Sequence, residues 1–506
     1  MDNKKTNQTM IVDTKQGKIR GTVASGVAVF KGVPYAKPPI GNLRFTPPQK
    51  MEPWDDVKDC LEFGSSATQM ETILVNTKPS EDCLYLNIWA PEKSEGKKYP
   101  VFFWIHGGGY FNGCGTMNYY DGTEFVNKDV ILVTINYRLG AMGFLALETL
   151  MKQYGTTGNW GTLDQIAALT WVKENIAAFG GDPEQITIGG ESAGSFSVTN
   201  LVMSPKAKGL FKRAVMQSGN LLSNKVSMPY TQANLEASIE ASRKFAEKFG
   251  ADDSPEGLEK LRQCDAYQLW ETGFFSSDVT VSAPLAFWPT LDGAVLPKNP
   301  EEALKQGEYN KAEYLMGFNQ NEGMVFLSET STPEGAEWFI DQVFKEKAQE
   351  VKDYYKNQGL EGLALIPDLV TYSYFKAGTI KMMQELANQG NTVYGYQFDF
   401  MPDGNYPMKE LGAHHAVDIL YTFDTIPASG LTEGEYDGFV AEQMHTMWCN
   451  FIANGNPNKG FSLPDSTPWD KFEADRKMMY YFNQKMESAP LKDEEKISYF
   501  QQLLYK

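Results

Sequence analysis

The chain has 506 residues, of which 42% are hydrophobic and 13% aromatic, so it can bury a large core. Its 64 acidic residues outnumber 46 basic ones, which gives a formal net charge of −18 and a pI near 4.8. A surface of that sign repels nucleic-acid phosphates and anionic lipids, so the composition argues against nucleic-acid and membrane partners.

Targeting and metal-binding signals are few. Residues 1–17 hold charged side chains but no apolar stretch of signal-peptide length, so a cytoplasmic protein is expected, with a secreted form that has lost its leader as the alternative. No apolar run approaches the ~18 residues of a membrane span. Four histidines and five widely spaced cysteines predict neither a multi-histidine metal centre nor a disulfide framework. The cysteines are Cys60, Cys83, Cys114, Cys264 and Cys449.

Short apolar runs alternate with helical patterns along the chain. Residues 10–35 predict small antiparallel strands, and helical patterns cover 164–178 and 232–263. Six runs bounded by turn residues predict buried parallel strands, at 101–105, 130–135, 186–188, 214–216, 314–316 and 393–398. This alternation predicts an α/β fold, in which residues 1–506 form one domain around a large, mostly parallel sheet with helices on both faces.

The sequence Gly-Glu-Ser-Ala-Gly at 190–194 follows the strand expected at 186–188 and precedes an apolar run that suits a helix. A G-x-S-x-G motif between a strand and a helix is typical of a nucleophile elbow. The turn is strained and the serine must project toward substrate, which explains the glycine on each side. Ser192 is therefore the candidate nucleophile, although an isolated motif of this kind also arises by chance.

Three consecutive glycines, Gly107, Gly108 and Gly109, follow the expected strand at 101–105. Each glycine loses much backbone entropy on folding, so three in a row are a costly way to build an ordinary loop. Without side chains, their backbone N–H groups can approach an oxyanion that develops during a reaction. The position of the run, after a buried strand and ahead of Ser192, favours this role over that of a flexible turn.

The base that activates a serine is usually a histidine, and an elbow of this kind predicts the chain order serine, acid, histidine. His106 lies upstream, inside the glycine motif, which leaves three histidines beyond Ser192. His445 lies in a helix-like stretch, where a structural role is expected. The pair His414 and His415 lies on a loop after a predicted strand and contains the candidate base.

The acid that orients the base is expected between the serine and the histidine pair. Glu322 follows the predicted strand at 314–316, in the loop Gly-Phe-Asn-Gln-Asn-Glu-Gly. A carboxylate on such a loop can reach across to a histidine on a neighbouring loop. Glu322 is therefore the candidate acid, and Asp399 is the alternative.

With these motifs in order, the chain resembles the type-B carboxylesterase and cholinesterase family, in particular its bacterial para-nitrobenzyl-esterase-like branch. The resemblance covers nearly the whole length and rests on several independent motifs. They are FKGVPYAKPPIGNLRF, SEDCLYLNIW, HGGGYFNG, INYRLGAMGFL, GNWGTLDQIAALTWVKENIAAFGGDP, ITIGGESAG, VMQSG and GAHHAVDILYTF. It implies an α/β-hydrolase fold and a hydrolase of small-molecule carboxylic esters that works through an acyl-enzyme, with no cofactor or metal.

The resemblance also implies roles for single residues. It makes Ser192 the nucleophile, Glu322 the acid and His415 the base. His415 is preferred to His414 because the family has an acidic residue three positions after the base, and here that residue is Asp418. Further implied roles are the oxyanion hole (Gly108, Gly109 and Ala193), neighbours of the catalytic groups (Glu191 and Ser218), and two salt bridges (Arg44–Glu81 and Arg138–Asp164).

The chain departs from the family pattern at its disulfides and at one loop. Ala67 stands where Cys83 would find its partner, and Ala251 and Lys260 stand where the later pair is expected, which suits a reducing compartment or a bacterial relative. The loop at 67–80 is short and lacks the tryptophan that gives cholinesterases a cation-binding face.

We therefore expect uncharged short- to medium-chain esters as substrates. The alternatives are hydrolysis of another acyl substrate (an amide, a lipid or a specialised ester) on the same site, or a non-catalytic homologue. The sequence leaves the oligomeric state open.

Overall fold

The computed structural model describes residues 8–72, 75–220, 222, 235–274, 287–327, 332–406, 408–427, 430–460 and 466–505. The first residues of the predicted helical region 232–263, and residues 73 and 74 of the loop at 67–80, lie outside this part. Within it, thirteen strands form one sheet in the spatial order β1-β2-β3-β5-β7-β6-β8-β9-β10-β11-β12-β13, with β4 paired to β2. The strands are β1 (Gln8–Asp13), β2 (Lys18–Ala24), β3 (Val27–Pro34), β4 (Lys58–Asp59), β5 (Tyr85–Pro91), β6 (Tyr99–Ile105), β7 (Ile131–Ile135), β8 (Gly181–Glu191), β9 (Arg213–Gln217), β10 (Glu313–Asn319), β11 (Val393–Phe398), β12 (Met478–Phe482) and β13 (Glu487–Pro490).

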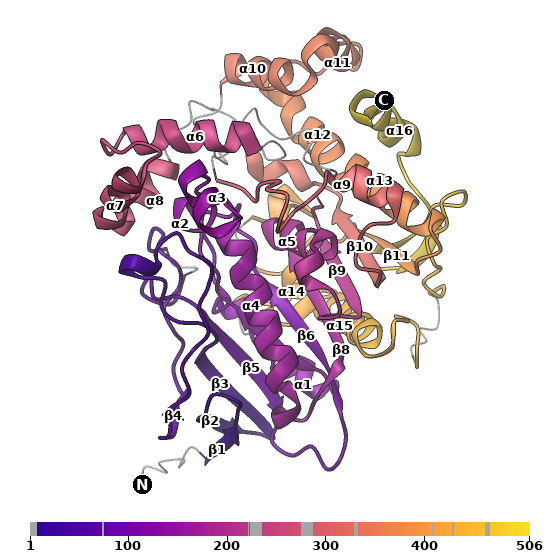
Figure 1. Cartoon of the computed structure of the whole chain (residues 1–506). Helices are drawn as coiled ribbons and strands as arrows, with labels where there is room; N and C mark the ends of the chain where they lie inside the picture. The colour runs from indigo at the N-terminus through magenta and orange to yellow at the C-terminus, as the bar shows by residue number, and fades with distance from the viewer. Residues whose placement is uncertain are drawn as a thin grey trace.

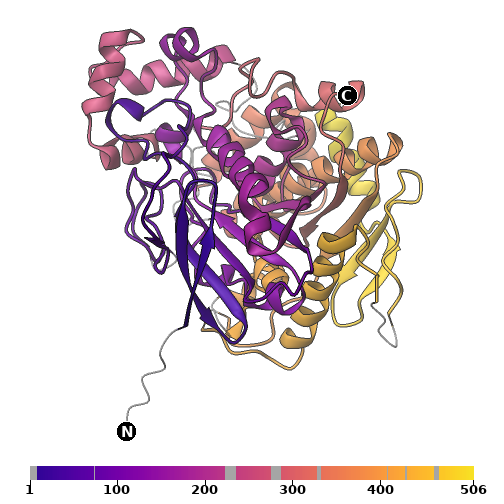
Figure 2. The same ribbon diagram turned by 60° about the horizontal axis from the view of Figure 1, so that its bottom comes forward.

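The sheet is parallel in its middle and antiparallel at its ends. The pairs from β7–β6 through β11–β12 are parallel. The pairs β1–β2, β2–β3, β3–β5, β5–β7 and β12–β13 are antiparallel. Figure 2 shows the N-terminal strands and the C-terminal strands at opposite sides of the molecule. The six predicted parallel strands and the small antiparallel strands at the N-terminus are confirmed.

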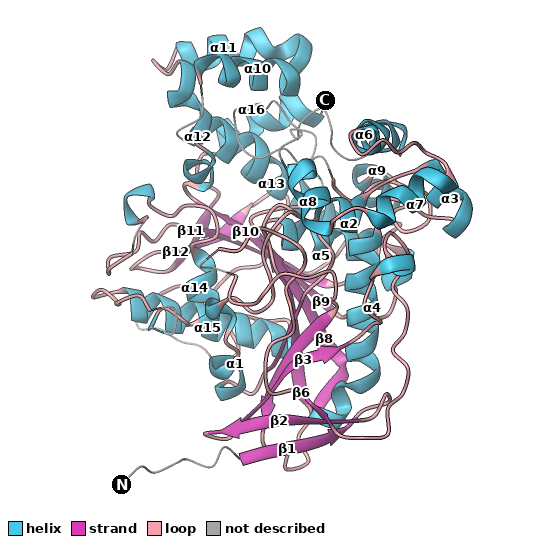
Figure 3. Cartoon of the chain, turned by 90° about the vertical axis from the view of Figure 1, so that its left-hand side faces the viewer, coloured by secondary structure: helices cyan, strands magenta, loops and turns pink. Residues whose placement is uncertain are grey.

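Helices cover both faces of the sheet, and Figure 3 shows α4 and α5 on one face and α1, α14 and α15 on the other. The α-helices of the described residues are α1 (Thr123–Asn127), α2 (Gly140–Phe144), α3 (Glu148–Tyr154), α4 (Trp160–Asn175), α5 (Ala193–Met203), α6 (Leu235–Glu247), α7 (Pro255–Gln263), α8 (Ala266–Phe274), α9 (Pro300–Gln306), α10 (Pro333–Phe344), α11 (Ala348–Lys356), α12 (Ile366–Val370), α13 (Ala377–Asn388), α14 (Asp418–Phe423), α15 (Asp437–Asn454) and α16 (Glu494–Tyr505), most of them labelled in Figure 1. No helix in this part of the chain is long and apolar enough to cross a membrane.

Strand β6 shows why its sequence is a continuous apolar run. Val101, Phe103 and Ile105 pack into the core under α4 and α5, whereas Phe102 and Trp104 pack into the core under α14 and α15. Successive side chains of a strand point to opposite faces, so a strand with a core on each face needs an apolar residue at every position. The two cores therefore share one sheet.

The topology brings three loops to one edge of the sheet. β8, β10 and β11 run parallel, so their carboxyl ends lie at the same edge. Ser192 follows β8, Glu322 follows β10 in the 3-10 turn η6 (Glu322–Phe326), and His415 lies on the loop after β11. Ligand sites of α/β sheets form at this edge.

Candidate active site

Ser192 forms the tip of a strained turn between β8 and α5. Its φ of 54° and ψ of −124° place a non-glycine residue in a region that L-residues rarely adopt. Ser192 is partly exposed, whereas Glu191 and Ala193 beside it are buried. A Cβ on Gly194 would lie 2.0 Å from the carbonyl oxygen of Ile105, so β6 passes too close for any side chain there. The glycine thus allows close packing as well as the turn.

Glu322 and His415 meet at this edge of the sheet. Glu322 Oε2 lies 2.6 Å from His415 Nδ1, and Oε1 accepts a hydrogen bond of 2.7 Å from the backbone N–H of Asn319. Nδ1 donates to this carboxylate, so Nε2 is the ring nitrogen left for other contacts. Nε2 lies 3.2 Å from Oε1 of Glu191, the residue before Ser192, which places it next to the elbow.

Two phenylalanines flank the imidazole of His415. The ring of Phe375 lies 4.8 Å and that of Phe326 5.3 Å from it, measured between centroids. They limit the rotation of the imidazole and give the site apolar walls. Phe326 ends η6, only four residues after Glu322, whereas Phe375 comes from a distant segment of the chain.

The other predicted candidates lie elsewhere. Asp399 accepts a hydrogen bond of 2.6 Å from Gln397 Nε2 and pairs with Lys492 Nζ at 2.9 Å, so it does not orient the histidine. His445 lies inside α15 and bonds to the carbonyl oxygen of Thr422 at 2.8 Å, as a structural histidine would. His414 Nδ1 lies 2.7 Å from the carbonyl oxygen of His415, and its ring stacks on Tyr406.

The carboxylates around His415 change its acidity. Burial would lower the pKa of His415, but the negative charges of Glu191, Glu322 and Asp418 outweigh it and raise the pKa to about 9. Burial raises the pKa of Glu191 to about 8, although His415 opposes this. The imidazole is therefore a stronger base than in solution.

The glycine loop has the geometry expected of an anion site. Gly108 and Gly109 have φ values of 104° and 62°, which glycine adopts without strain. A Cβ on Gly108 would lie 2.2 Å from the carbonyl oxygen of Asn112. Within the described residues, no hydrogen-bond acceptor takes the N–H of Gly108, Gly109 or Ala193. Both loop glycines are partly exposed, so these donors are open to a bound oxyanion.

Two residues that sequence reasoning missed hold the glycine loop. Gln69 binds Gly113 at both ends, with Oε1 accepting from its N–H at 2.8 Å and Nε2 donating to its carbonyl oxygen at 2.9 Å. Trp270 Nε1 donates to the carbonyl oxygen of Phe111 at 2.7 Å. Gln69 lies two residues after Ala67, the position compared with the family's cysteine, so this segment offered a signal. Trp270 lies in α8, and no motif pointed to it.

A buried network that the sequence did not predict holds the backbone around the histidine. Asp418 is fully buried and accepts hydrogen bonds from Gln217 Nε2 at 2.8 Å, Tyr396 OH at 2.9 Å and Asn319 Nδ2 at 3.1 Å. Asn319 Nδ2 also donates to the carbonyl oxygen of His414 at 2.7 Å. Asp418 begins α14, so the network joins this helix to the ends of three neighbouring strands.

Two features of the family pattern, a bond from Ser218 to the acid and disulfides between cysteines, are absent from the described residues. The N–H of Ser218 donates to the carbonyl oxygen of Gly317 at 2.9 Å, but its hydroxyl has no hydrogen-bond partner among the described residues. It therefore does not bind the Glu322 carboxylate. All five cysteines are free, and Ala67 lines a small cavity together with Cys83.

Both predicted salt bridges are present. Arg44 binds Glu81 through two hydrogen bonds of 2.6 Å, and Arg138 binds Asp164 through two of 2.7 Å. Bidentate pairs of this kind fix the orientation of both side chains. Both residues are buried, and because Arg138 follows β7 and Asp164 lies in α4, the pair joins these two segments.

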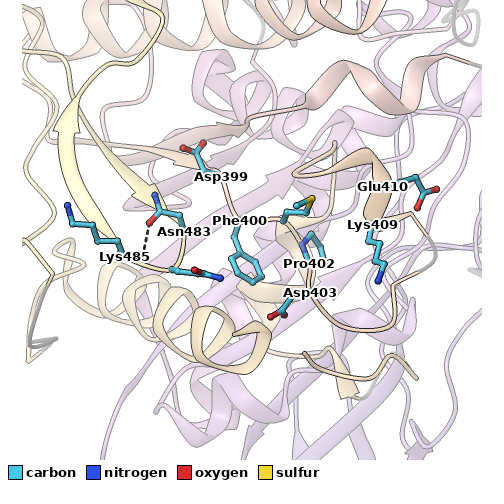
Figure 4. A pocket seen from close by; sticks show the side chains of 10 residues that line it. Asp399, Phe400, Pro402, Asp403, Lys409, Glu410, Asn483 and Lys485 are labelled. Carbon is cyan, nitrogen blue, oxygen red and sulfur yellow. Dashed lines mark hydrogen bonds between the residues drawn. The ribbon is translucent and has the colours of Figure 1, made fainter. Parts of the chain in front are cut away.

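An open groove of about 760 Å³ lies apart from these residues, and neither Ser192, Glu322 nor His415 lines it. It is formed by Asp399, Phe400, Met401, Pro402, Asp403, Lys409, Glu410, Asn483, Gln484 and Lys485 (Figure 4). The groove contains the alternative acid Asp399, which places that carboxylate outside the candidate site.

Comparison with known proteins gives a consistent picture. The family model described as the carboxylesterase family matches residues 8–500. The para-nitrobenzyl esterase of Bacillus subtilis (strain 168) is 34% identical over 464 residues, which cover 88% of this chain and 90% of that protein. Carboxylesterase 1E of Mus musculus is 35% identical, over 92% of this chain and 89% of that protein. A solved structure of a PNB esterase superposes with a TM-score of 0.84 and 31% identity, over 98% of this chain and 100% of the other.

Proposed function

Because the chain belongs to the carboxylesterase family and is a serine carboxylic-ester hydrolase with the α/β-hydrolase fold, we propose that Ser192, His415 and Glu322 perform its reaction. The observation that carries the proposal is the orientation of His415. Its Nδ1 donates to Glu322 Oε2 at 2.6 Å, and its Nε2 lies at the elbow, 3.2 Å from Glu191 Oε1. A general base needs one ring nitrogen held by a carboxylate and the other near the nucleophile, and these two contacts support that role for His415.

In the first step, His415 Nε2 takes the proton of Ser192 while Oγ attacks the ester carbonyl carbon. The carbonyl oxygen becomes an oxyanion, and the N–H groups of Gly108, Gly109 and Ala193 would hold it, since none has another acceptor in the described part of the chain. The buried Glu322 keeps the proton on Nδ1 and stabilises the imidazolium.

In the second step, His415 returns its proton to the alcohol, which leaves, and Ser192 remains acylated. Water enters and gives a proton to the same Nε2 as its oxygen attacks the acyl carbon. The second tetrahedral intermediate uses the same three N–H donors. As it collapses, Nε2 returns its proton to the Ser192 oxygen, which releases the acid and restores the free Ser192 hydroxyl.

For the substrate, we propose uncharged short- to medium-chain acyl esters. Phe326 and Phe375 provide apolar walls beside the imidazole, and the loop at 67–80 contains no aromatic residue. An aromatic cation site is worth roughly 0.5 to 2 kcal/mol, so its absence from this loop removes a reason to prefer choline esters. Amides, lipids or a specialised ester remain the alternative acyl substrates for the same site.

The arrangement of the chain supports two coarser proposals. The two apolar cores lie on opposite faces of one sheet, which favours a single domain over residues 1–506. Four of the five free thiols are buried, which favours a reducing compartment such as the cytoplasm. Five titratable thiols in the denatured protein without reductant would support the reducing compartment, whereas a Cys60–Cys83 bridge found by mass spectrometry would refute it.

Hydrolysis of a chromogenic butyrate ester by the wild type and Ser192→Ala tests the proposed reaction, and a panel of amides and longer acyl esters tests the alternatives. For the substrate class, kcat/KM is compared between butyrylthiocholine and a neutral butyrate thioester of similar size. We expect the neutral thioester to be preferred at 150 mM salt, where charges beyond about 8 Å are screened. A clear advantage for the choline substrate would refute the substrate proposal but not the reaction.

A further inference from the structure

The loop that carries Glu322 packs directly against a helical segment from much later in the chain. This segment comprises α12 and the short π-helical turn η9 (Thr371–Lys376). Gly323, next to Glu322, marks the point of contact. A Cβ at this position would lie 1.9 Å from the carbonyl oxygen of Pro367 in α12, so only glycine allows the two backbones to come so close.

One hydroxyl joins the two segments. Thr371 Oγ1 accepts a hydrogen bond of 2.9 Å from the backbone N–H of Gly323 and donates one of 2.7 Å to the carbonyl oxygen of Pro367. Thr371 is buried, with 4% of its surface exposed. A buried hydroxyl that is both donor and acceptor has one preferred orientation, so it holds the peptide between Glu322 and Gly323 in place.

That peptide determines where the Glu322 carboxylate points. On one side, Oε1 is held by the N–H of Asn319 at 2.7 Å, and on the other, the peptide that follows Glu322 is held by Thr371 at 2.9 Å. Between these anchors, Oε2 lies 2.6 Å from His415 Nδ1. A displacement of about 1 Å at a catalytic group can cost 10²-fold in rate, so the second anchor matters for the reaction.

The same turn also reaches the base. Phe375, four residues after Thr371, places its ring 4.8 Å from the imidazole of His415. π-helical turns are rare in proteins, and those that occur often lie at functional sites. We propose that Thr371 is a positioning residue for Glu322, an inference that rests on the proposed function, and that η9 couples the placement of the acid to that of the base.

Thr371→Val tests this because it keeps the shape of the side chain and removes the hydroxyl. Thr371→Ser keeps the hydroxyl. Ser373→Ala is the matched control: Ser373 is a buried hydroxyl in the same turn that donates to the carbonyl oxygen of Leu369 at 2.6 Å and has no hydrogen bond to the Glu322 loop. kcat, KM, the pH profile of kcat/KM and thermal unfolding are measured for all three and for the wild type.

We expect Thr371→Val to lower kcat by about tenfold or more with KM nearly unchanged. A less well placed Glu322 raises the pKa of His415 less, so the acid limb of kcat/KM should move to lower pH. Thr371→Ser and Ser373→Ala should keep the wild-type kcat and the wild-type position of the acid limb of kcat/KM. Equal losses in Thr371→Val and Ser373→Ala, or an unshifted limb in Thr371→Val, would overturn the inference. Ser192→Ala is measured alongside, because activity near the wild-type level in that variant refutes the proposed function itself, whatever the Thr371 variants do.

Discussion

The two sides of the candidate site are held by different means. The nucleophile side, residues 106–113 and 190–194, depends mainly on backbone: glycines that allow close packing, and N–H groups with no acceptor in the described part of the chain. Two side chains from other segments, Gln69 and Trp270, hold only the outer part of its glycine loop. The acid–base side, residues 319–326 and 411–418, depends on side chains from other segments, among them Gln217, Tyr396 and Thr371. Backbone geometry depends on local sequence, whereas a side-chain network depends on how distant segments come together. The first side should therefore be sensitive to any added atom, and the second to the loss of single polar groups.

The largest effects are expected where the two sides meet. Ser192→Ala and His415→Ala should each lower kcat by at least about 10³-fold, because the proposed nucleophile and base act as a unit. Glu322→Gln should cost less if the hydrogen bond to Nδ1 survives. Steady-state kinetics on a butyrate ester measure this. If the double variant Ser192→Ala/His415→Ala were far slower than either single variant, the two residues would not share one step.

The next largest effect is expected at Asp418, whose hydrogen-bond network supports the acid–base side. Asp418→Asn replaces a buried acceptor of three hydrogen bonds, and one unsatisfied buried group costs about 1–3 kcal/mol, so kcat should fall by about tenfold. Asp437→Asn is the control, because Asp437 is also buried and accepts hydrogen bonds, from Tyr421, Gly404 and Gly434, but does not touch the loop of the histidine. Both variants should unfold at lower temperature, and only Asp418→Asn should be slow. Equal kcat values would show that the Asp418 network supports stability alone.

These differences also explain what the sequence could predict. Gly107–Gly109 and Gly190–Gly194 are local motifs, so the sequence alone predicts the candidate elbow and the candidate glycine loop. The parallel strands followed from continuous apolar runs, because a strand with a core on each face leaves no polar position. Trp270 and Thr371 were missed because their partners, Phe111 and Gly323, are distant in sequence and meet only in the folded chain. Asp399 remained open as the acid for the same reason, until the pairing with Lys492 excluded it.

A moderate effect is expected on the pH dependence of kcat/KM. It tests how the carboxylates of both sides change the pKa of His415. The proposed reaction needs neutral His415, so kcat/KM should rise with pH through the pKa of this residue. The carboxylates raise that pKa to about 9 against the effect of burial, so the acid limb should lie above the usual value near 6.5. Glu191, with a pKa of about 8, ionises before His415 does. Glu191→Gln removes this charge and should move the acid limb of kcat/KM to lower pH. A limb that stays in place or moves up would mean that Glu191 does not act on the base.

The smallest effect is expected at His414, the residue that the sequence could not separate from His415 by position alone. Its Nδ1–H donates to the His415 carbonyl oxygen at 2.7 Å, and its ring stacks on Tyr406. His414 therefore contacts the backbone of His415, whereas the carboxylates of Glu191 and Glu322 contact the His415 ring. One such hydrogen bond is worth about 1 kcal/mol, which corresponds to a loss of less than tenfold in kcat/KM for His414→Ala. The imidazole of His415 would keep Glu322 at Nδ1, so the acid limb should not move. A dead His414→Ala beside an active His415→Ala would instead assign the base to His414. In that case, the hydrogen bond between His415 and Glu322 would be structural, and the acid–base side of the site would have to be assigned again.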